Sequence, residues 1–276
     1  MKRAIAWLLA IVLVGCGLCG CQKKTATKDL SWEKISAGST LKVGIDPMCV
    51  PMTFLDSEGD ATGFEFLLAK EVCARLGLTM KIVEMDRKDA AARLKDGTID
   101  CFWSGLVHSE ENDDAMELMA PYLRTSYYVA VKNDAEAEQL IDLTGKKLGV
   151  IRTQSSYRLL LKAEHFLSLL EGGGFRSFDA IEEAIEELDS GKIDALILDS
   201  ATTDYYQNLG KDIRLLQNGM QTEILLTEEL TIGFREGEVA LREKIEEGIA
   251  TMRRDGSLER LSIAWFGKNV LLSEDA

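Results

Sequence analysis

The chain has 276 residues, a hydrophobic content of 46% and a formal net charge of −14 at pH 7. This length and apolar content predict a folded body of one large domain or two domains of ordinary size. The acidic balance argues against a nucleic-acid-binding protein, because phosphate backbones attract basic surfaces.

Residues 1–20 have the pattern of a bacterial signal peptide. Two basic residues precede a mostly apolar run that is shorter than the roughly 20 residues needed to span a bilayer. The run ends in LCGC, which resembles the lipobox of lipoproteins and predicts a lipid on Cys21. LVGC offers Cys16 as an alternative, and an ordinary cleaved signal is another. The polar segment 21–37 is then a tether, and we expect the body on the outer face of the bacterial cytoplasmic membrane.

After the tether, short apolar strands alternate with amphipathic helices. In chain order we expect a strand over 41–45, a rigid proline-containing loop over 46–54, a helix over 64–76, a strand over 78–83, a helix over 87–96, a strand over 99–103 that ends in Ser104-Gly105, and an irregular stretch over 106–120. This alternation predicts an α/β fold with a mostly parallel sheet and helices on both faces.

The second half continues the alternation. We expect an extended segment over 127–132, a strand over 148–151, a helix with Leu160, Ala163, Leu167 and Leu170 on one stripe, a helix over 179–188, a buried strand that ends at Asp199, a second extended segment over 230–235 and a final helix with Leu241, Ile245, Ile249 and Met252 on one face. The two extended segments have similar patterns, and we interpret them as two crossings between lobes.

Two stretches of the chain share one sequence pattern. In LKDGTIDCFWSG (94–105) and LDSGKIDALILDS (188–200), a leucine, a glycine and an Ile-Asp pair precede an apolar run. LKVGID (41–46) and KLGVIR (147–152) form a fainter pair. The alternative is that helix–glycine–strand sequences are common in any α/β protein. Two pairs in the same order favour two similar α/β lobes, and a cleft between such lobes suits a small ligand.

Metal and cofactor sites are not expected. The sequence contains no CxxC and no Cys/His spacing typical of metal ligands, and His108 and His165 are isolated. Cys73 and Cys101 lie in apolar patterns, which predicts that they are core residues.

The ordered set of these stretches resembles the extracytoplasmic solute-binding proteins of polar amino acid ABC transporters, bacterial solute-binding protein family 3. The residues that carry the resemblance run from Leu41 to Gly267 and include LKVGID, PMTF, GFEFLLAKEVCARLG, LKDGTIDCFWSGL, PYL, DLTGKKLGV, GKIDALILDS and DGSLERLSIAWFG. The resemblance implies two Rossmann-like α/β lobes joined by two hinge strands, the periplasmic-binding-protein-like fold of type II. Lobe 1 would comprise 38–131 plus 227–276, and lobe 2 would comprise 132–226.

The resemblance also implies a set of ligand-binding positions. They are Asp46, Cys49, Phe54, Arg87, Ser104, Gly105, Val107, Asn112, Arg152, Ser155 and Asp199. Asp199 matches the family residue that takes the ligand ammonium through a charge-assisted hydrogen bond. The alternative is that Asp199 only caps the next helix. Ser155 matches a turn residue that offers donors to the ligand carboxylate at a helix start.

Lobe 1 departs from the family pattern. Asn112 stands where the family has the arginine that grips the ligand carboxylate, and Val107 replaces a hydroxyl residue. Cys49 aligns with a tyrosine, and Arg87 aligns with the aromatic residue that stacks on the ligand. Either Arg87 or Arg152 replaces the missing arginine, or the ligand has no free α-carboxylate there. Both arginines could equally be solvated surface residues.

These patterns favour a monomeric, lipid-anchored binding protein that closes over an amino acid or related solute and passes it to ABC permease subunits. One alternative is a dehydratase-like enzyme with a cleft carboxylate as general acid, for which the sequence offers only Asp46 and His108 as partners of Asp199. No nucleophile motif such as GxSxG is present, so we do not expect an enzyme. The other alternative is a binding protein whose ligand has diverged from amino acids.

Overall fold

The computed structural model describes residues 28–218, 221–222 and 224–273. The predicted signal peptide, Cys16, Cys21 and the first part of the predicted tether therefore lie outside the described residues. No helix in the described part of the chain is long and apolar enough to cross a bilayer.

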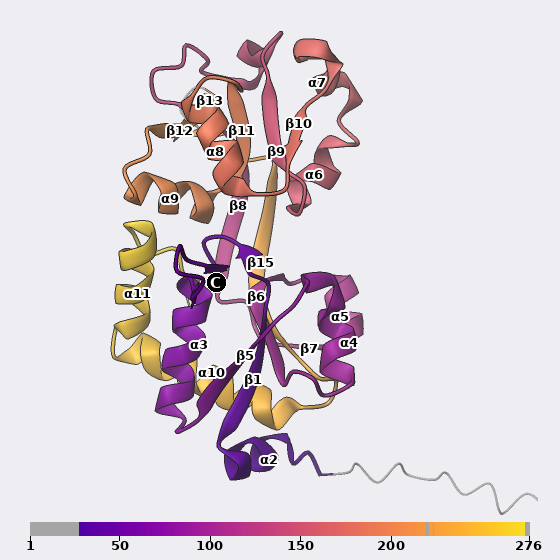
Figure 1. The fold of residues 1–276 in the computed structure, drawn as a ribbon, viewed down its shortest axis with the longest axis vertical. Helices are drawn as coiled ribbons and strands as arrows, with labels where there is room; N and C mark the ends of the chain where they lie inside the picture. The colour runs from indigo at the N-terminus through magenta and orange to yellow at the C-terminus, as the bar shows by residue number, and fades with distance from the viewer. Residues whose placement is uncertain (1–27, 219–220, 223, 274–276) are drawn as a thin grey trace, which may run out of the picture.

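One ten-stranded sheet runs through the molecule and joins two α/β lobes (Figure 1). Its main path follows the order β10-β9-β11-β8-β15-β6-β1-β5, with β12 paired to β8 and β7 paired to β15. The antiparallel strands β8 (Leu123–Lys132) and β15 (Leu226–Phe234) pair with each other in the middle of this path. They are the two predicted crossings, and the prediction of two lobes joined by two hinge strands is confirmed.

Lobe 1 lies in the lower half of Figure 1. Its elements are α2 (Ser31–Gly38), β1 (Thr40–Ile45), β2 (Met48–Cys49), β3 (Thr53–Leu55), β4 (Ala61–Thr62), α3 (Phe64–Arg75), β5 (Thr79–Glu84), η1 (Arg87–Asp89), α4 (Ala90–Lys95), β6 (Cys101–Val107), α5 (Glu110–Ala115), β7 (Glu117–Leu118), α10 (Val239–Arg254) and α11 (Ser257–Phe266). Strand β1 pairs in parallel with both β5 and β6, as the alternation of strands and helices predicts.

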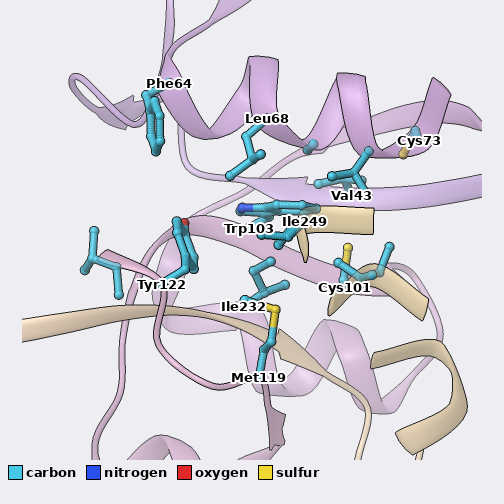
Figure 2. Packing of buried hydrophobic residues seen from close by; sticks show 14 of the residues in the cluster. Val43, Phe64, Leu68, Cys73, Cys101, Trp103, Met119, Tyr122, Ile232 and Ile249 are labelled. Carbon is cyan, nitrogen blue, oxygen red and sulfur yellow. The ribbon is translucent and has the colours of Figure 1, made fainter. Parts of the chain in front are cut away.

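Alternate residues of β6 enter two different cores, because successive side chains of a strand point to opposite faces. Cys101 and Trp103 join the core under α3, α10 and α11. Phe102 and Leu106 pack against α4 on the other face. Figure 2 shows the ring of Trp103 next to Leu68 of α3. Cys73 and Cys101 are buried, which confirms them as core residues.

Lobe 2 lies in the upper half of Figure 1. Its elements are η2 (Leu140–Leu143), β9 (Leu148–Ile151), α6 (Ser155–Leu160), α7 (Glu164–Leu169), η3 (Glu171–Gly173), β10 (Arg176–Phe178), α8 (Ile181–Asp189), β11 (Ala195–Asp199), α9 (Ser200–Asn208), β12 (Ile213–Leu215), β13 (Gln217–Asn218) and β14 (Gln221–Thr222). Strand β11 is parallel to β9 and antiparallel to the hinge strand β8. This position brings the carboxyl end of β11 next to the hinge.

The two lobes also meet outside the hinge, where α9 packs against α11 (Figure 1). The ring of Tyr205 stacks on Trp265 with centroids 5.6 Å apart. The amide of Asn208 donates to the carbonyl oxygen of Ala264 at 3.0 Å. Phe54, which is a predicted ligand contact, packs edge-on against both Tyr205 and Trp265. Its ring therefore belongs to this interlobe contact.

Four segments differ from the sequence prediction. The proline-containing loop contributes β2 and β3 to a small three-stranded sheet. Strand β6 continues to Val107, because Leu230 and Thr231 of β15 pair with its last residues. The stretch over 106–120 contains α5 and β7. The helix after β9 is two short helices, with a non-helical backbone at Ala163 between them.

Helix α2 lies in the segment that the sequence predicts to be a tether. Trp32 and Ile35 pack against the lobe 1 core. The carboxylate of Asp29 accepts the N–H of Ala240 at 2.6 Å, and the hydroxyl of Ser31 accepts the N–H of Leu241 at 3.0 Å. These side chains satisfy donors that the first turn of α10 leaves without intrahelical partners. The folded part of lobe 1 therefore begins before residue 38.

We expect Leu68→Ala to lower the free energy of unfolding by about 2–5 kcal/mol, because Leu68 is fully buried in the lobe 1 core and its truncation leaves a cavity. The matched control is Leu161→Ala, since Leu161 is exposed and its truncation should change stability by less than about 0.5 kcal/mol. Urea denaturation of both variants measures the difference. Equal costs would contradict the assignment of the core.

Candidate functional site

A cavity lies between the lobes at the hinge. One face of the paired hinge strands forms its floor, with Thr125 and Tyr127 from β8 and Glu228 and Leu230 from β15. Glu228 lies directly opposite Thr125 in the strand register. Residues two apart on a strand share a face, so these four side chains point the same way.

Asp199 presents a fixed carboxylate from the lobe 2 side. It is 6% exposed and caps the start of α9. One carboxylate oxygen accepts the hydroxyl of Thr125 at 2.8 Å and the N–H of Thr202 at 3.1 Å, and the other accepts the hydroxyl of Thr202. Asp199 is thus a helix cap and a lining residue of the cavity at once, because the cap leaves the carboxylate at the cavity wall.

The turn between β9 and α6 forms the other part of the lobe 2 wall. Thr153, Gln154 and Ser155 all line the cavity. Ser155 and Tyr127 place hydroxyl groups beside the Glu228 carboxylate. Burial raises the pKa of Glu228 above its usual value, while these two hydroxyl groups oppose the change.

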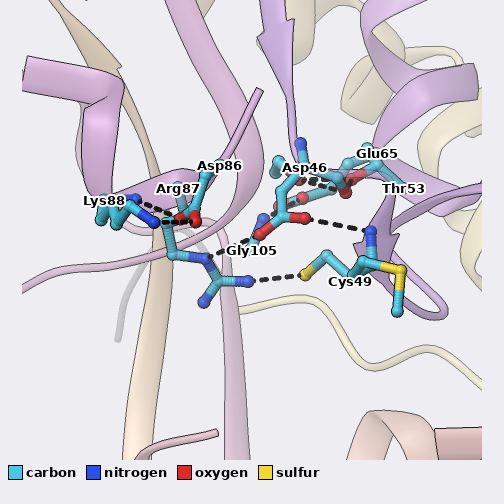
Figure 3. Close-up of polar contacts among 10 residues, drawn as sticks. Asp46, Cys49, Thr53, Glu65, Asp86, Arg87, Lys88 and Gly105 are labelled. Atoms are coloured by element: carbon cyan, nitrogen blue, oxygen red, sulfur yellow. Dashed lines mark hydrogen bonds and ion pairs between the residues drawn. The ribbon is translucent and has the colours of Figure 1, made fainter. Parts of the chain in front are cut away.

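Arg87 is the cation that lobe 1 contributes to the cavity. Its guanidinium donates to the sulfur of Cys49 at 2.9 Å, and its Nε lies 3.9 Å from an Asp46 carboxylate oxygen (Figure 3). Burial raises the pKa of the Cys49 thiol to about 11, so the thiol is protonated at neutral pH. The Asp46 carboxylate is therefore an ion-pair partner of Arg87 at a distance beyond a direct hydrogen bond.

The buried carboxyl group of Glu65 lies directly behind the part of the cavity wall that lobe 1 forms. Gly105 lines the cavity, and its N–H donates to Glu65, which also accepts the hydroxyl of Tyr122. Gly105 has a φ of +56°, and a Cβ at this position would lie 2.5 Å from the sulfur of Cys49. Only glycine suits this position, because any other residue would be strained at a positive φ and its Cβ would collide with Cys49 in the cavity wall. Burial raises the pKa of Glu65 to about 7.

The structure brings six of the predicted site residues together. Cys49, Arg87, Gly105, Val107, Ser155 and Asp199 line the cavity. Asp46 and Asn112 line a wider chamber that adjoins it toward α4 and α5. The side-chain amide of Asn112 donates to the carbonyl oxygen of Val107 at 2.7 Å. This contact ties Asn112 to the end of β6.

Ser104 and Arg152 do not line the cavity. Ser104 is fully buried and hydrogen-bonds to Thr53 and to the N–H of Asp46, so it holds the loop after β1 in place. Arg152 is exposed and donates from Nε to Asp179 at 2.7 Å. Of the two arginines that could replace the family arginine, Arg87 is the one that lines the cavity.

The sequence prediction missed the hinge residues Thr125, Tyr127 and Glu228. The predicted extended segments, 127–132 and 230–235, begin after Thr125 and Glu228, and the face that turns to the cavity depends on the register between β8 and β15. The acidic pair at 228–229 in an otherwise apolar strand was the available signal. Among the described residues, no group of three or more His, Cys, Asp or Glu side chains could hold a metal ion.

The family model described as bacterial extracellular solute-binding proteins, family 3, matches residues 41–268. The chain belongs to this family. A family-3 protein is what the resemblance in the sequence predicts, and the two lobes, hinge strands and interlobe cavity agree with it.

Three comparisons illustrate how this family-3 protein relates to others. The L-cystine-binding protein TcyJ of Escherichia coli (strain K12) is 25% identical over 272 residues, which cover 98% of this chain and 97% of the relative. The histidine-binding periplasmic protein of Escherichia coli (strain K12) is 27% identical over 234 residues, covering 83% and 88%. An ABC uptake transporter substrate binding protein from Streptococcus pneumoniae, solved with bound histidine, superposes with a TM-score of 0.71 at 26% identity, covering 89% and 99%. All three are named as binding proteins.

We expect the stability of this family-3 protein to depend on pH through Glu65. Its native pKa of about 7 exceeds the ordinary value of 4.5, so the native state binds the proton more tightly than the unfolded state. The stabilisation is therefore present below pH 4.5 and lost as pH rises to 7, by about 3 kcal/mol. Glu65→Gln removes this loss. Urea denaturation of both proteins between pH 4.5 and 7.5 measures this loss. A difference in unfolding free energy between the two proteins that stays constant with pH would contradict the prediction.

Proposed function

We propose that the protein is the substrate-binding component of an ABC importer, and that it captures an amino acid or a related small polar solute in the interlobe cavity. The observation that carries the proposal is the pairing of opposite charges across one cavity. Arg87 comes from lobe 1 and Asp199 from lobe 2. A zwitterion satisfies both, with its carboxylate on Arg87 and its ammonium on Asp199.

The chemistry of the two groups suits this orientation. A guanidinium holds a carboxylate with two parallel N–H donors, which supplies the function of the family arginine from a new position. The Asp199 carboxylate is already held by Thr125 and Thr202, so an ammonium meets a preorganised acceptor. Neither lobe holds both groups, so full binding requires the lobes to close about the hinge.

The relatives support this proposal through what their names say. They bind L-cystine and histidine, and the similar solved structure holds histidine. A monomer that closes over its solute would then deliver it to permease subunits in the membrane. A lipid on Cys21 would keep it on the outer face of the cytoplasmic membrane, which is where such a permease opens to the outside.

We expect Arg87→Met to weaken amino acid binding by about 2–5 kcal/mol, because the ligand carboxylate would be buried without its charged partner. Isothermal titration calorimetry with the twenty standard amino acids and L-cystine identifies the ligand and measures the loss. Arg152→Met is the matched control, since Arg152 pairs with Asp179 outside the cavity. We expect it to bind as the parent protein does. Equal losses in both variants, or none in Arg87→Met, would refute the role of Arg87.

We expect lipid labelling of the protein in bacterial cells to disappear in Cys21→Ser and to persist in Cys16→Ser. The reason is the position of LCGC directly before the polar tether. Metabolic incorporation of a labelled fatty acid is the measurement. Persistence of the label in Cys21→Ser with loss in Cys16→Ser would show that Cys16 carries the lipid. Persistence in both variants would exclude both lipobox cysteines.

A further inference from the structure

We propose that Glu228 is a specificity-determining residue, which selects ligands that carry a second, distal positive charge in addition to the α-ammonium group. The favoured solutes would be cationic amino acids or elongated solutes with a distal ammonium or guanidinium. This inference rests on the proposed function, because it assumes that Arg87 and Asp199 hold the amino acid end of the ligand.

The first argument is the place of Glu228. It lines the inner cavity and also the wider chamber that adjoins it. Arg87, Val107, Thr153 and Ser155 are shared by the two spaces in the same way. Glu228 therefore stands where the inner cavity opens into the chamber. A ligand that is held at Arg87 and Asp199 and extends toward the chamber passes this carboxylate.

The second argument is the balance of charge. The charged residues that line the inner cavity are Arg87, Asp199 and Glu228. A simple zwitterion neutralises the first two and leaves the third. Arg87 does not compensate Glu228 fully, because it also faces Asp46 and would be occupied by the ligand carboxylate. Glu228 is half-buried, and the groups that contact its carboxylate are the uncharged hydroxyls of Ser155 and Tyr127, so a ligand that brings a second cation supplies a countercharge that a neutral ligand does not.

The third argument is the surroundings of Glu228. The groups that face it are Asp199 from lobe 2, Arg87 from lobe 1, and the hydroxyl groups of Tyr127 and Ser155. Burial raises the pKa of Glu228, and a bound cation would lower that pKa again. Gln154, which lines the same cavity, has a buried side-chain oxygen without a hydrogen-bond partner in the described part of the chain. Both residues are acceptors, and a distal N–H donor suits both.

The hinge strand itself provides a matched control. Glu229 follows Glu228 in sequence but points to the opposite face of β15, where it accepts hydrogen bonds from Arg124 at 2.7 and 3.1 Å. It does not line the inner cavity. Glu229→Gln therefore removes one negative charge from the same strand without changing the cavity.

The test compares cationic ligands with neutral ligands of the same shape by isothermal titration calorimetry. The probes are L-arginine against L-citrulline and L-lysine against L-6-hydroxynorleucine. In the parent protein, we expect the cationic member of at least one pair to bind at least about tenfold more tightly, because the neutral member leaves the half-buried Glu228 carboxylate without a countercharge from the ligand. In Glu228→Gln we expect this ratio to fall below about threefold, while Glu229→Gln keeps it.

Thermal melts of the three proteins verify that each variant is folded before its ratio is interpreted. Equal binding of cationic and neutral members in the parent protein, or an unchanged ratio in Glu228→Gln, overturns the role of Glu228. Tight binding of neutral amino acids without a charge preference also overturns the role of Glu228, but it leaves the proposed function intact. If the parent protein binds none of these probes, none of the standard amino acids and no L-cystine, both the function and this inference fail.

Discussion

The antiparallel pairing of β8 with β15 is the constraint on which the rest of the structure depends. The two strands pair along one stretch, from Leu226 opposite Tyr127 to Leu230 opposite Leu123. On either side of it they part, because β8 continues beside β11 of lobe 2 and β15 beside β6 of lobe 1. One continuous sheet thus carries both lobes, and a cavity at its centre receives side chains from each lobe and from the hinge.

Three separate parts of the chain supply the charges of this cavity, and contacts that include distant parts of the chain hold two of these charges in place. Thr125 and Thr202 hold the carboxylate of Asp199, and Cys49 holds the guanidinium of Arg87. Such preorganisation matters because a polar ligand loses its hydration when it binds. If the groups that replace its water had to be ordered during binding, the cost would lower the affinity. In the proposed complex, fixed dipoles and charges of the cavity would replace the solvation of the ligand.

Helix α9 connects the cavity to the contact between the lobes. Its first turn is capped by Asp199, which lines the cavity. Further along the same helix, Tyr205 stacks on Trp265 of lobe 1, and the carboxylate of Asp204 lies 2.8 Å from the ammonium of Lys268. One helix therefore bears both a lining residue of the cavity and a contact between the lobes.

The sequence by itself determined the two α/β lobes, because the periods of strands and helices are local properties of the chain. It also placed Asp199, which directly follows an apolar run that could only be a buried strand. Only the tertiary structure decided which polar residues face the cavity. The sequence places Ser104 and Arg152 at predicted strand ends, as it does Asp199, yet Ser104 is buried behind the cavity wall against Thr53 and Arg152 turns outward to Asp179. Glu228 faces inward because the register with β8 and the lobe 2 turn above it bury that side of the strand. These directions depend on contacts between residues far apart in sequence, and no local pattern encodes them.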